Sequence, residues 1–241
     1  MKLLVDIGNT SLKAALWNEQ QATPVSMSEV PWQAITEVVY ACVGKSDLLN
    51  EVLTLAAKKN IPCFEAHVSK NLSGLSCAYE QVGNLGIDRW LALVASFTLY
   101  PNTPCIIVDA GTATTIDVLS GEGEHLGGWI LPGLDLMTRS LTQNTQRVFD
   151  DANTPFVNEL GKNTPNGLKN GALVATLGAI EQAKKQLAHL TCTQNPQILC
   201  AGGYGSLLQQ QITGSIFDSL LVMKGLNYWY ELSKNDEKQQ N

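Results

Sequence analysis

The stretch LLVDIGNTSLKAAL (residues 3–16) has a counterpart later in the chain, IIVDAGTATTIDVL (residues 106–119). In both, an apolar run ends in Asp-x-Gly, and a cluster of small polar residues leads into a second apolar run. The matches lie at a constant offset of 103 and pair Val5, Asp6, Gly8 and Leu16 with Val108, Asp109, Gly111 and Leu119. Each stretch predicts a buried strand, a tight glycine turn and a returning strand, and the repetition predicts two related halves.

Length and composition agree with a folded chain of two halves. The 241 residues are 44% hydrophobic and 16% charged, which is the composition of a globular protein and allows one large domain or two modest ones. The repeat favours two, with an N-terminal domain at 1–104 and a C-terminal domain at 105–241.

Charge and cysteine usage narrow the class of protein. A net charge of −6 argues against nucleic acid as the main partner. The six cysteines form no C-x-x-C pair and the three histidines complete no zinc spacing, so free thiols in a reducing compartment are expected. Asp6 interrupts the first apolar run, which argues against a signal peptide, and no run approaches the roughly 20 apolar residues of a membrane span. A cytoplasmic protein without a membrane partner is therefore expected.

Helical and strand patterns alternate along the chain and predict an α/β fold. Residues 86–100 have the spacing of a helix with one buried face. The polar tail at 233–241 lacks apolar anchors and is expected to fray. Residues 127–141 predict a Gly-rich turn, a short strand and a helix. The other expected elements are strands at 36–43 and 61–66, helices at 47–60 and 171–190, and a strand, glycine turn and helix over 196–212.

The two Asp-x-Gly turns are candidate phosphate sites. Backbone N–H groups and side chains such as Asn9, Thr10 and Ser11 can bind phosphate oxygens, while Asp6 holds hydrated Mg²⁺ or another cation. Thr112, Thr114 and Thr115 would do the same beside Asp109. The alternative is that each Asp-Gly makes an ordinary hairpin, but two copies at matched positions favour a clamp.

Other nucleotide-binding patterns are absent or ambiguous. The sequence contains no G-x-x-x-x-G-K-[ST], and no G-x-G-x-x-G follows a strand. Gly202 and Gly203 follow the strand QILCA, where missing side chains would let a base and ribose lie against the backbone. An ordinary connection between strand and helix explains the same two glycines.

Asp88 and Arg89 form the remaining charged pair of interest. A helix cap with a surface ion pair would account for them. Near a bound γ-phosphate, however, Asp88 could accept the proton of an attacking hydroxyl, and Arg89 could bind a substrate carboxylate.

Four ordered motifs resemble those of type III pantothenate kinases. They are DIGNT (6–10), LGIDRW (85–90), DAGTATTID (109–117) and GGWILPG (127–133), and the resemblance extends over residues 1 to about 230. It implies two ribonuclease H-like domains of the acetate and sugar kinase, Hsp70 and actin superfamily, with ATP between them. It also implies phosphorylation of pantothenate, the first step toward coenzyme A, in a homodimer.

The resemblance further implies roles for individual residues. Asp88 matches the catalytic base, and Asp109 matches the ligand of a monovalent cation, K⁺ or NH₄⁺, that acts besides the Mg²⁺ of ATP. The implied ATP-binding residues are Asp6, Ile7, Gly8, Asn9, Thr10, Ser11, Leu12, Lys13 and Thr112. The implied pantothenate-binding residues are Tyr79, Gly86, Ile87, Asp88, Arg89 and Thr164. One departure is Val82, where the family often has proline.

Two other functions stay open at this point. The chain could be a nucleotide-binding transcription accessory protein of the same superfamily, which would need the phosphate clamp but neither a base nor a carboxylate-binding Arg. An actin-like filament former usually needs a longer chain with inserted subdomains. Asp88-Arg89 therefore favours the kinase.

Overall fold

The computed structural model describes residues 1–8, 12–42, 47–192 and 195–240. The chain forms two compact units. The first comprises Met1–Pro101, Gly123–His125 and Leu220–Asn241, and the second comprises Asn102–Glu122 and Leu126–Ser219. The segment from residue 220 onward thus belongs to the first unit, whereas the division at 104/105 would group it with the second half.

The first unit is built on a five-stranded sheet of order β3-β2-β1-β4-β5. The central strand β1 (Lys2–Ile7) pairs antiparallel with β2 (Leu12–Asn18) and parallel with β4 (Glu37–Cys42). The edge strands are β3 (Gln21–Pro24) and β5 (Cys63–Glu65).

The second unit repeats this topology with order β10-β9-β8-β11-β12. Its central strand β8 (Cys105–Ala110) pairs antiparallel with β9 (Ala113–Leu119) and parallel with β11 (Gln197–Ala201). The edge strands are β10 (His125–Pro132) and β12 (Ile216–Phe217). The predicted duplication of a mixed α/β unit is confirmed.

The register of the two hairpins corrects one detail of the repeat. Leu3 pairs with Leu16, but Ile106, which lies 103 residues after Leu3, pairs with Val118. The second turn is therefore shorter by one residue, and it closes with a hydrogen bond from the Gly111 N–H to the Ala113 carbonyl at 2.9 Å. Val118, and not Leu119, is the structural counterpart of Leu16.

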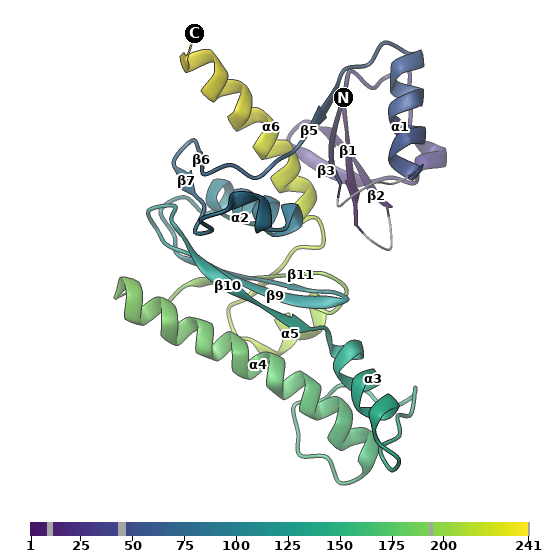
Figure 1. Ribbon diagram of the computed structural model, residues 1–241, viewed down its shortest axis with the longest axis vertical. Coiled ribbons are helices and arrows are strands. Elements are labelled where there is room, and N and C mark those ends of the chain that lie inside the picture. Colours follow the sequence, from purple (N-terminus) through teal and green to yellow (C-terminus); the bar gives the residue numbers. More distant parts are fainter. Residues whose placement is uncertain (9–11, 43–46, 193–194, 241) are drawn as a thin grey trace. The chain divides into compact units, whose positions relative to one another are not determined.

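Helices cover the first sheet on both faces. Helix α1 (Asp47–Lys58) packs on the face that carries Leu3 and Val5 (Figure 1). Helices α2 (Ile87–Leu99) and α6 (Leu221–Gln240) pack against each other and against β4. The prediction of one buried face on α2 was wrong, because every residue from Arg89 to Ser96 is buried.

In the second unit, a long helix runs along one face of the sheet (Figure 1). Helix α4 (Thr164–Thr191) and α5 (Gly205–Gln211) form a core with Ile106 and Val108 of β8. Helix α3 (Leu134–Asn144) follows β10. The helix expected at 171–190 begins seven residues earlier, at Thr164, since Asn163 supplies an N-cap and Pro165 suits the first turn.

Two expectations about irregular segments were wrong. Gly127 and Gly128 lie inside strand β10 instead of forming a turn before it. The tail is helical through Gln240, and the Asp236 carboxylate accepts hydrogen bonds from the Ser73 N–H at 3.0 Å and hydroxyl at 2.6 Å. Polar contacts, which an apolar pattern cannot show, thus attach the C-terminal helix to the first unit.

The remaining elements are short. They are the hairpin β6 (Asn71–Leu72) and β7 (Leu75–Ser76) and the 3₁₀ turns η1 (Met27–Glu29) and η2 (Val82–Asn84). Among the described residues, no helix combines the length and apolar character that a membrane crossing needs. No disulfide joins the six cysteines.

Candidate active site

The first hairpin places Asp6 at the end of β1, directly opposite Lys13 in the antiparallel ladder. Opposed residues share a face, so the carboxylate of Asp6 and the exposed Lys13 side chain lie on one side of the hairpin. Ile7 is 2% exposed, and Leu12 packs against the same core, so both side chains serve the fold and leave only their backbone for a ligand. Gly8 is exposed, and the predicted ligands Asn9, Thr10 and Ser11 lie outside the described residues.

In the second hairpin, Asp109 lies at the end of β8 and Thr112 is exposed in the turn. The Thr112 carbonyl accepts a hydrogen bond from the Gly133 N–H at 3.0 Å. A Cβ at Gly133 would lie 2.1 Å from the Gly111 oxygen and 2.6 Å from the Thr112 oxygen. Gly133, at the end of the GGWILPG motif, thus packs directly against the turn of the second hairpin, in a contact that only glycine allows.

Gly202 marks an oxygen-lined position beside Asp109. Its φ is +79°, and a Cβ there would lie 2.4 Å from the Asp109 Oδ1 and 2.5 Å from the Ala110 oxygen. Gly203 has no atom within 4 Å of its Cβ position and opens to solvent. Only glycine at position 202 therefore allows the backbone after β11 to approach the second hairpin this closely. The sequence analysis instead expects Gly202 to make room for a base and ribose.

The donor set around the second hairpin fits a hard cation. Asp109 provides a carboxylate and the turn provides carbonyl oxygens, the ligands that Mg²⁺ and alkali cations take. The described chain holds no cluster of three His, Cys, Asp or Glu residues that could coordinate a metal alone. A cation here would complete its shell with water or substrate oxygens.

Asp88 lies in the first turn of α2 and is exposed. Its Oδ1 accepts a hydrogen bond from the Arg89 N–H at 2.8 Å, and a Cβ on Gly86 would lie 2.6 Å from this oxygen. Glycine at the N-cap position therefore leaves room for the carboxylate. Ile87 is the first helical residue between them.

Arg89, in contrast, is only 5% exposed. Its Nη1 donates to the Tyr79 hydroxyl at 2.9 Å, and the guanidinium carbon lies 5.6 Å from the centre of the Tyr79 ring. A surface ion pair is thus excluded as the explanation of Asp88-Arg89. The structure brings Tyr79, Gly86, Asp88 and Arg89 together at the start of α2.

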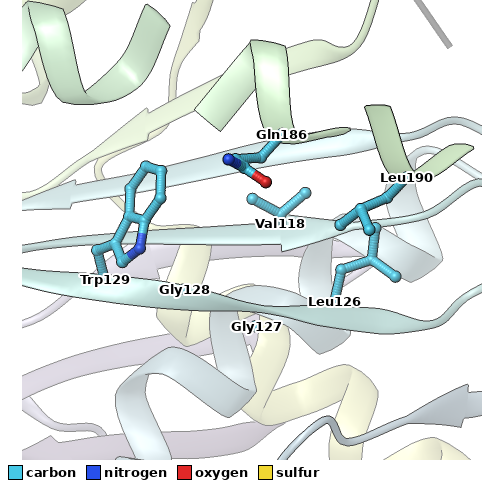
Figure 2. A pocket seen from close by; sticks show the side chains of 7 residues that line it. All are labelled: Val118, Leu126, Gly127, Gly128, Trp129, Gln186 and Leu190. Carbon is cyan, nitrogen blue, oxygen red and sulfur yellow. The ribbon is translucent and has the colours of Figure 1, made fainter. Parts of the chain in front are cut away.

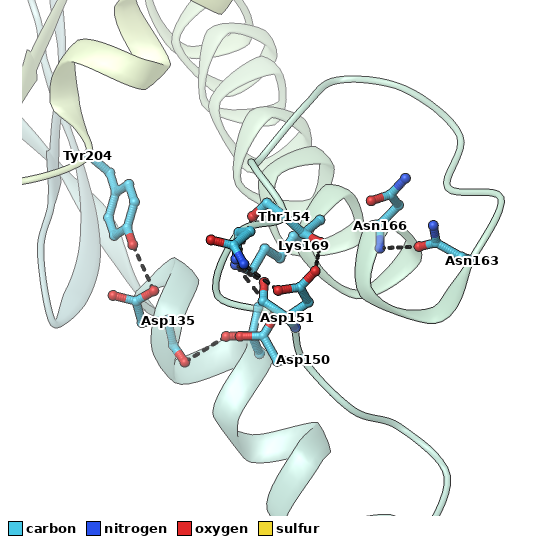
Figure 3. A network of polar contacts seen from close by, with 10 residues as sticks. Asp135, Asp150, Asp151, Thr154, Asn163, Asn166, Lys169 and Tyr204 are labelled. Atoms are coloured by element: carbon cyan, nitrogen blue, oxygen red, sulfur yellow. Dashed lines mark hydrogen bonds and ion pairs between the residues drawn. The ribbon is translucent and has the colours of Figure 1, made fainter.

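Thr164, the remaining predicted substrate residue, is exposed at the start of α4 in the second unit. The Asn163 side chain caps this helix by accepting from the Asn166 N–H at 2.9 Å, and the preceding loop is tied down by Lys169 (Figure 3). The buried Lys169 Nζ donates to the carbonyls of Asp151 at 2.9 Å and Thr154 at 2.8 Å. Thr164 therefore lies at a helix N-terminus that is held in place by the Asn163 cap and by the contacts of Lys169.

A hydroxyl contact links two further elements of the second unit in the same view. The Tyr204 hydroxyl donates to the Asp135 Oδ1 at 2.7 Å (Figure 3). Burial, followed by this hydrogen bond, raises the pKa of Tyr204 to about 12, so its proton stays in place at neutral pH. The contact joins the glycine turn after β11 to the first turn of α3.

A separate pocket of about 340 Å³ lies between the sheet and the C-terminal half of α4 (Figure 2). The residues that line it are Val118, Leu126, Gly127, Gly128, Trp129, Gln186 and Leu190. None of the predicted site residues is among them. None of the lining residues carries a positive charge, so the pocket does not suit a triphosphate.

A sequence model described as Type III pantothenate kinase matches residues 2–186. A curated Type III pantothenate kinase of Pseudoalteromonas translucida is 70% identical, over 99% of this chain and 100% of its own length. The chain belongs to the type III pantothenate kinase family. A second member, from Colwellia psychrerythraea, is 33% identical over 95% of each chain.

Solved structures agree on the fold of this type III pantothenate kinase. A putative Baf family transcriptional activator from Campylobacter jejuni superposes with a TM-score of 0.61 at 22% identity, covering 97% of this chain and 99% of that one. A putative 2-dehydro-3-deoxygalactonokinase from Sinorhizobium meliloti gives a TM-score of 0.55 at 10% identity, covering 96% and 98%. The resemblance inferred from the four motifs is confirmed, as is the duplicated ribonuclease H-like fold.

Some contributors to the kinase's site were missed from sequence. Gly133 ends the GGWILPG motif and Gly202 follows the strand QILCA, but the sequence pattern links neither glycine to the second hairpin. The available signal was the position of each glycine directly after a strand that neighbours the hairpin in the fold. Lys70 and His125, which contact the backbone around Tyr79, carried no sequence signal.

Proposed function

We propose that this chain transfers the γ-phosphoryl group of ATP to the primary hydroxyl of pantothenate, the first step of coenzyme A synthesis. The observation that carries the proposal is the start of α2, where an exposed Asp88 precedes a buried Arg89 whose guanidinium contacts Tyr79. A protein that only sensed nucleotides would need neither group. The 70% identical pantothenate kinase supports the same substrate.

Asp88 acts as the general base in this proposal. Its carboxylate is solvent-accessible and accepts a hydrogen bond from the Arg89 N–H. It accepts the proton of the pantothenate hydroxyl as that oxygen attacks the γ-phosphorus. The proton thus ends on Asp88, and the bond between the γ-phosphorus and the β,γ-bridging oxygen breaks as ADP leaves.

Arg89 binds the pantothenate carboxylate. A guanidinium that is mostly withdrawn from water forms a stronger charge-assisted contact than a surface group does. Tyr79 orients the guanidinium through the hydroxyl that it presents to Nη1. The Gly86 and Ile87 backbone lines the same helix start, and Thr164 is the remaining substrate ligand in the proposal.

The two hairpins bind ATP. Backbone groups of residues 6–13, Lys13 and Thr112 contact the phosphates, with Asp6 and Asp109 facing the cations. Mg²⁺ and a monovalent cation, K⁺ or NH₄⁺ at Asp109, supply charge neutralisation of the phosphate oxygens when bound. The carboxylate and carbonyl oxygens beside Gly202 support this assignment.

The proposal also includes a cytoplasmic homodimer. Exposed apolar side chains of the second unit offer a surface for a second copy, among them Ile130 at 66%, Leu190 at 58% and Val174 at 47% exposure. Sedimentation velocity at micromolar concentration measures this directly, and a single species of monomer mass would contradict it.

A coupled assay of ADP release with ATP, Mg²⁺, K⁺ and pantothenate tests the function, with the phosphorylated product confirmed by mass spectrometry. Turnover that depends on pantothenate is expected. A correctly folded protein that binds ATP without phosphorylating pantothenate would instead support the nucleotide-binding regulatory alternative.

A further inference from the structure

The segment before Tyr79 is held by side chains at its backbone. The Lys70 Nζ donates to the carbonyl oxygens of Cys77 at 2.8 Å and Tyr79 at 3.2 Å. Between these two carbonyls, the Ala78 N–H donates to His125 Nδ1 at 3.4 Å. Three successive residues, Cys77 to Tyr79, therefore each have a backbone polar group fixed by a side chain from elsewhere in the first unit.

His125 also supports the Tyr79 ring. The two rings are nearly parallel, at an interplanar angle of 12° with centroids 6.2 Å apart. His125 is 1% exposed and accepts at Nδ1 from an N–H, so its ring is held in a fixed position. The Arg89 guanidinium carbon lies 5.6 Å from the centre of the same Tyr79 ring.

The segment that carries His125 is itself fixed to the first unit. The Ser76 N–H donates to the Gly123 carbonyl at 2.9 Å. Gly123 has a φ of +83°, and a Cβ there would lie 2.6 Å from Phe97 of α2 and 3.0 Å from the Gly74 oxygen. Residues 123–125 thus fit closely between the β6–β7 hairpin and helix α2, whose first turn carries Asp88 and Arg89.

We infer that Lys70 and His125 are positioning residues for pantothenate: they set the place of Tyr79, and through its hydroxyl and ring the orientation of the Arg89 guanidinium. The inference rests on the proposed role of Arg89 as the carboxylate ligand. Neither residue touches the reacting atoms, so both should influence substrate affinity much more than the chemical step.

Lys70 gives the cleaner test because it is exposed, whereas changes at the buried His125 risk the fold. Lys70→Met keeps the aliphatic stem and removes the ammonium. We expect the pantothenate KM to rise about tenfold, the scale of losing one charge-assisted hydrogen bond, with kcat and the ATP KM within about twofold. Lys70→Arg retains donors and should recover part of the affinity. Lys184→Met, which removes an exposed ion pair with Glu181, is the matched control and should leave both KM values unchanged.

A double-mutant cycle with Tyr79→Phe separates positioning from a general structural effect. Tyr79→Phe removes the hydroxyl that Arg89 contacts and keeps the ring. If Lys70 acts through Tyr79, the double variant should have a pantothenate KM close to that of the more impaired single variant. The inference would be overturned if the increases in pantothenate KM of the two single variants multiplied in the double variant, or if Lys70→Met left this KM unchanged.

A conservative pair at position 125 gives a second, independent readout. His125→Asn keeps an acceptor near the Ala78 N–H, whereas His125→Leu removes it; for both, circular dichroism checks the folded fraction. A higher pantothenate KM for Leu than for Asn supports the inference, and equal values contradict the hydrogen-bonding role of His125. Failure of the proposed function is distinguishable, because the wild-type enzyme itself would then not turn over pantothenate.

Discussion

Asp88 and Arg89 are neighbours in the chain but occupy opposite environments. Asp88 is exposed at the N-terminus of α2, while Arg89 is 5% exposed and contacts Tyr79. A helix separates successive side chains by about 100°, so adjacent residues in its first turn can serve different partners. At the scale of the residue, this separation is what allows the proposed roles, a general base at Asp88 and a carboxylate ligand at Arg89, to fall on adjacent residues.

Asp88→Asn should lower kcat by about 10²-fold or more, the usual effect of losing a general base, and leave ATP binding nearly intact. Arg89→Gln should chiefly raise the pantothenate KM, because the carboxylate contact exists both before and during transfer. Steady-state kinetics, with the folded fraction measured by circular dichroism, decide between the roles. Near wild-type kcat in Asp88→Asn would mean that Asp88 only stabilises the helix start.

Asp6→Asn and Asp109→Asn should weaken ATP binding without unfolding the chain. Both side chains are partly exposed at strand ends, so a neutral amide of the same size leaves the core undisturbed. Calorimetric titration of the nucleotide and thermal unfolding measure the two effects separately. Lost cooperative unfolding with unchanged ATP affinity would assign the affected aspartate a structural role.

At the scale of elements, the turn of the second hairpin depends on neighbours distant in sequence. Gly133, after β10, touches the second turn, and Gly202, after β11, touches Asp109. In the first unit, α6 is attached to the sheet by a polar cluster in which the Glu37 carboxylate accepts from the Tyr230 hydroxyl at 2.7 Å and Lys234 Nζ at 3.0 Å. The glycine contact can be tested by adding one methyl group, and the polar cluster can be tested by removing one charge.

Gly133→Ala should displace the second hairpin, because the new Cβ would overlap the Gly111 and Thr112 oxygens. We expect a loss of about 1–3 kcal/mol in the free energy of unfolding, as for other overpacking changes, and a raised ATP KM. The matched control is Gly178→Ala in α4, where nothing lies within 4 Å of the new atom. There, the better helix propensity of alanine should maintain or increase stability. Equal behaviour of the two variants would contradict the contact.

Glu37→Gln should make stability less dependent on acid pH. Burial raises the pKa of Glu37, but the hydrogen bonds from Tyr230 and Lys234 and the charges of Lys234 and Lys2 outweigh it and leave the pKa below its ordinary value of 4.5. A lowered folded-state pKa stabilises the fold above the unfolded value, and this stabilisation is lost as pH falls through the folded value. At neutral pH the variant should melt about 2–4 °C lower, the shift for roughly 1 kcal/mol in a chain of this size.

The gap between wild type and Glu37→Gln should close as pH falls below 4.5, which differential scanning calorimetry at several pH values can follow. Glu181→Gln, which removes an exposed ion pair with Lys184, is the control and should change little at any pH. A gap that stays constant into acid would show that the Glu37 charge does not stabilise α6.

At the scale of the whole molecule, charge is the dominant constraint. The chain carries a net charge of −6 and presents Asp6 and Asp109 in the two hairpins proposed to bind an anionic triphosphate. Such a protein needs cations to bring the phosphates close. We therefore expect turnover to depend on the ionic composition of the solution.

Turnover should be much faster with K⁺ or NH₄⁺ than with Na⁺ alone at the same ionic strength. A cation beside Asp109 would offset triphosphate charge, and the larger ions suit a site made of carboxylate and carbonyl oxygens. Initial rates in chloride salts of each cation, with Mg²⁺ held constant, measure the preference, and Asp109→Asn should reduce it. Equal rates in sodium-only buffer would remove the monovalent cation from the mechanism.

The sequence by itself determined the duplicated strand–turn–strand units, because strand periodicity and turn glycines are local properties. Its four ordered motifs identified the family by resemblance and pointed to Asp88 and Arg89. Only the tertiary structure decided the shorter second turn, the burial of α2 on all sides, the helical tail attached through Asp236, and the contacts of Gly133, Gly202, Lys70 and His125. Each of these depends on which distant segment lies alongside. The sequence around a glycine or a lysine reads the same whether the residue faces solvent or a carbonyl oxygen. Only the packing of distant segments distinguishes these two environments.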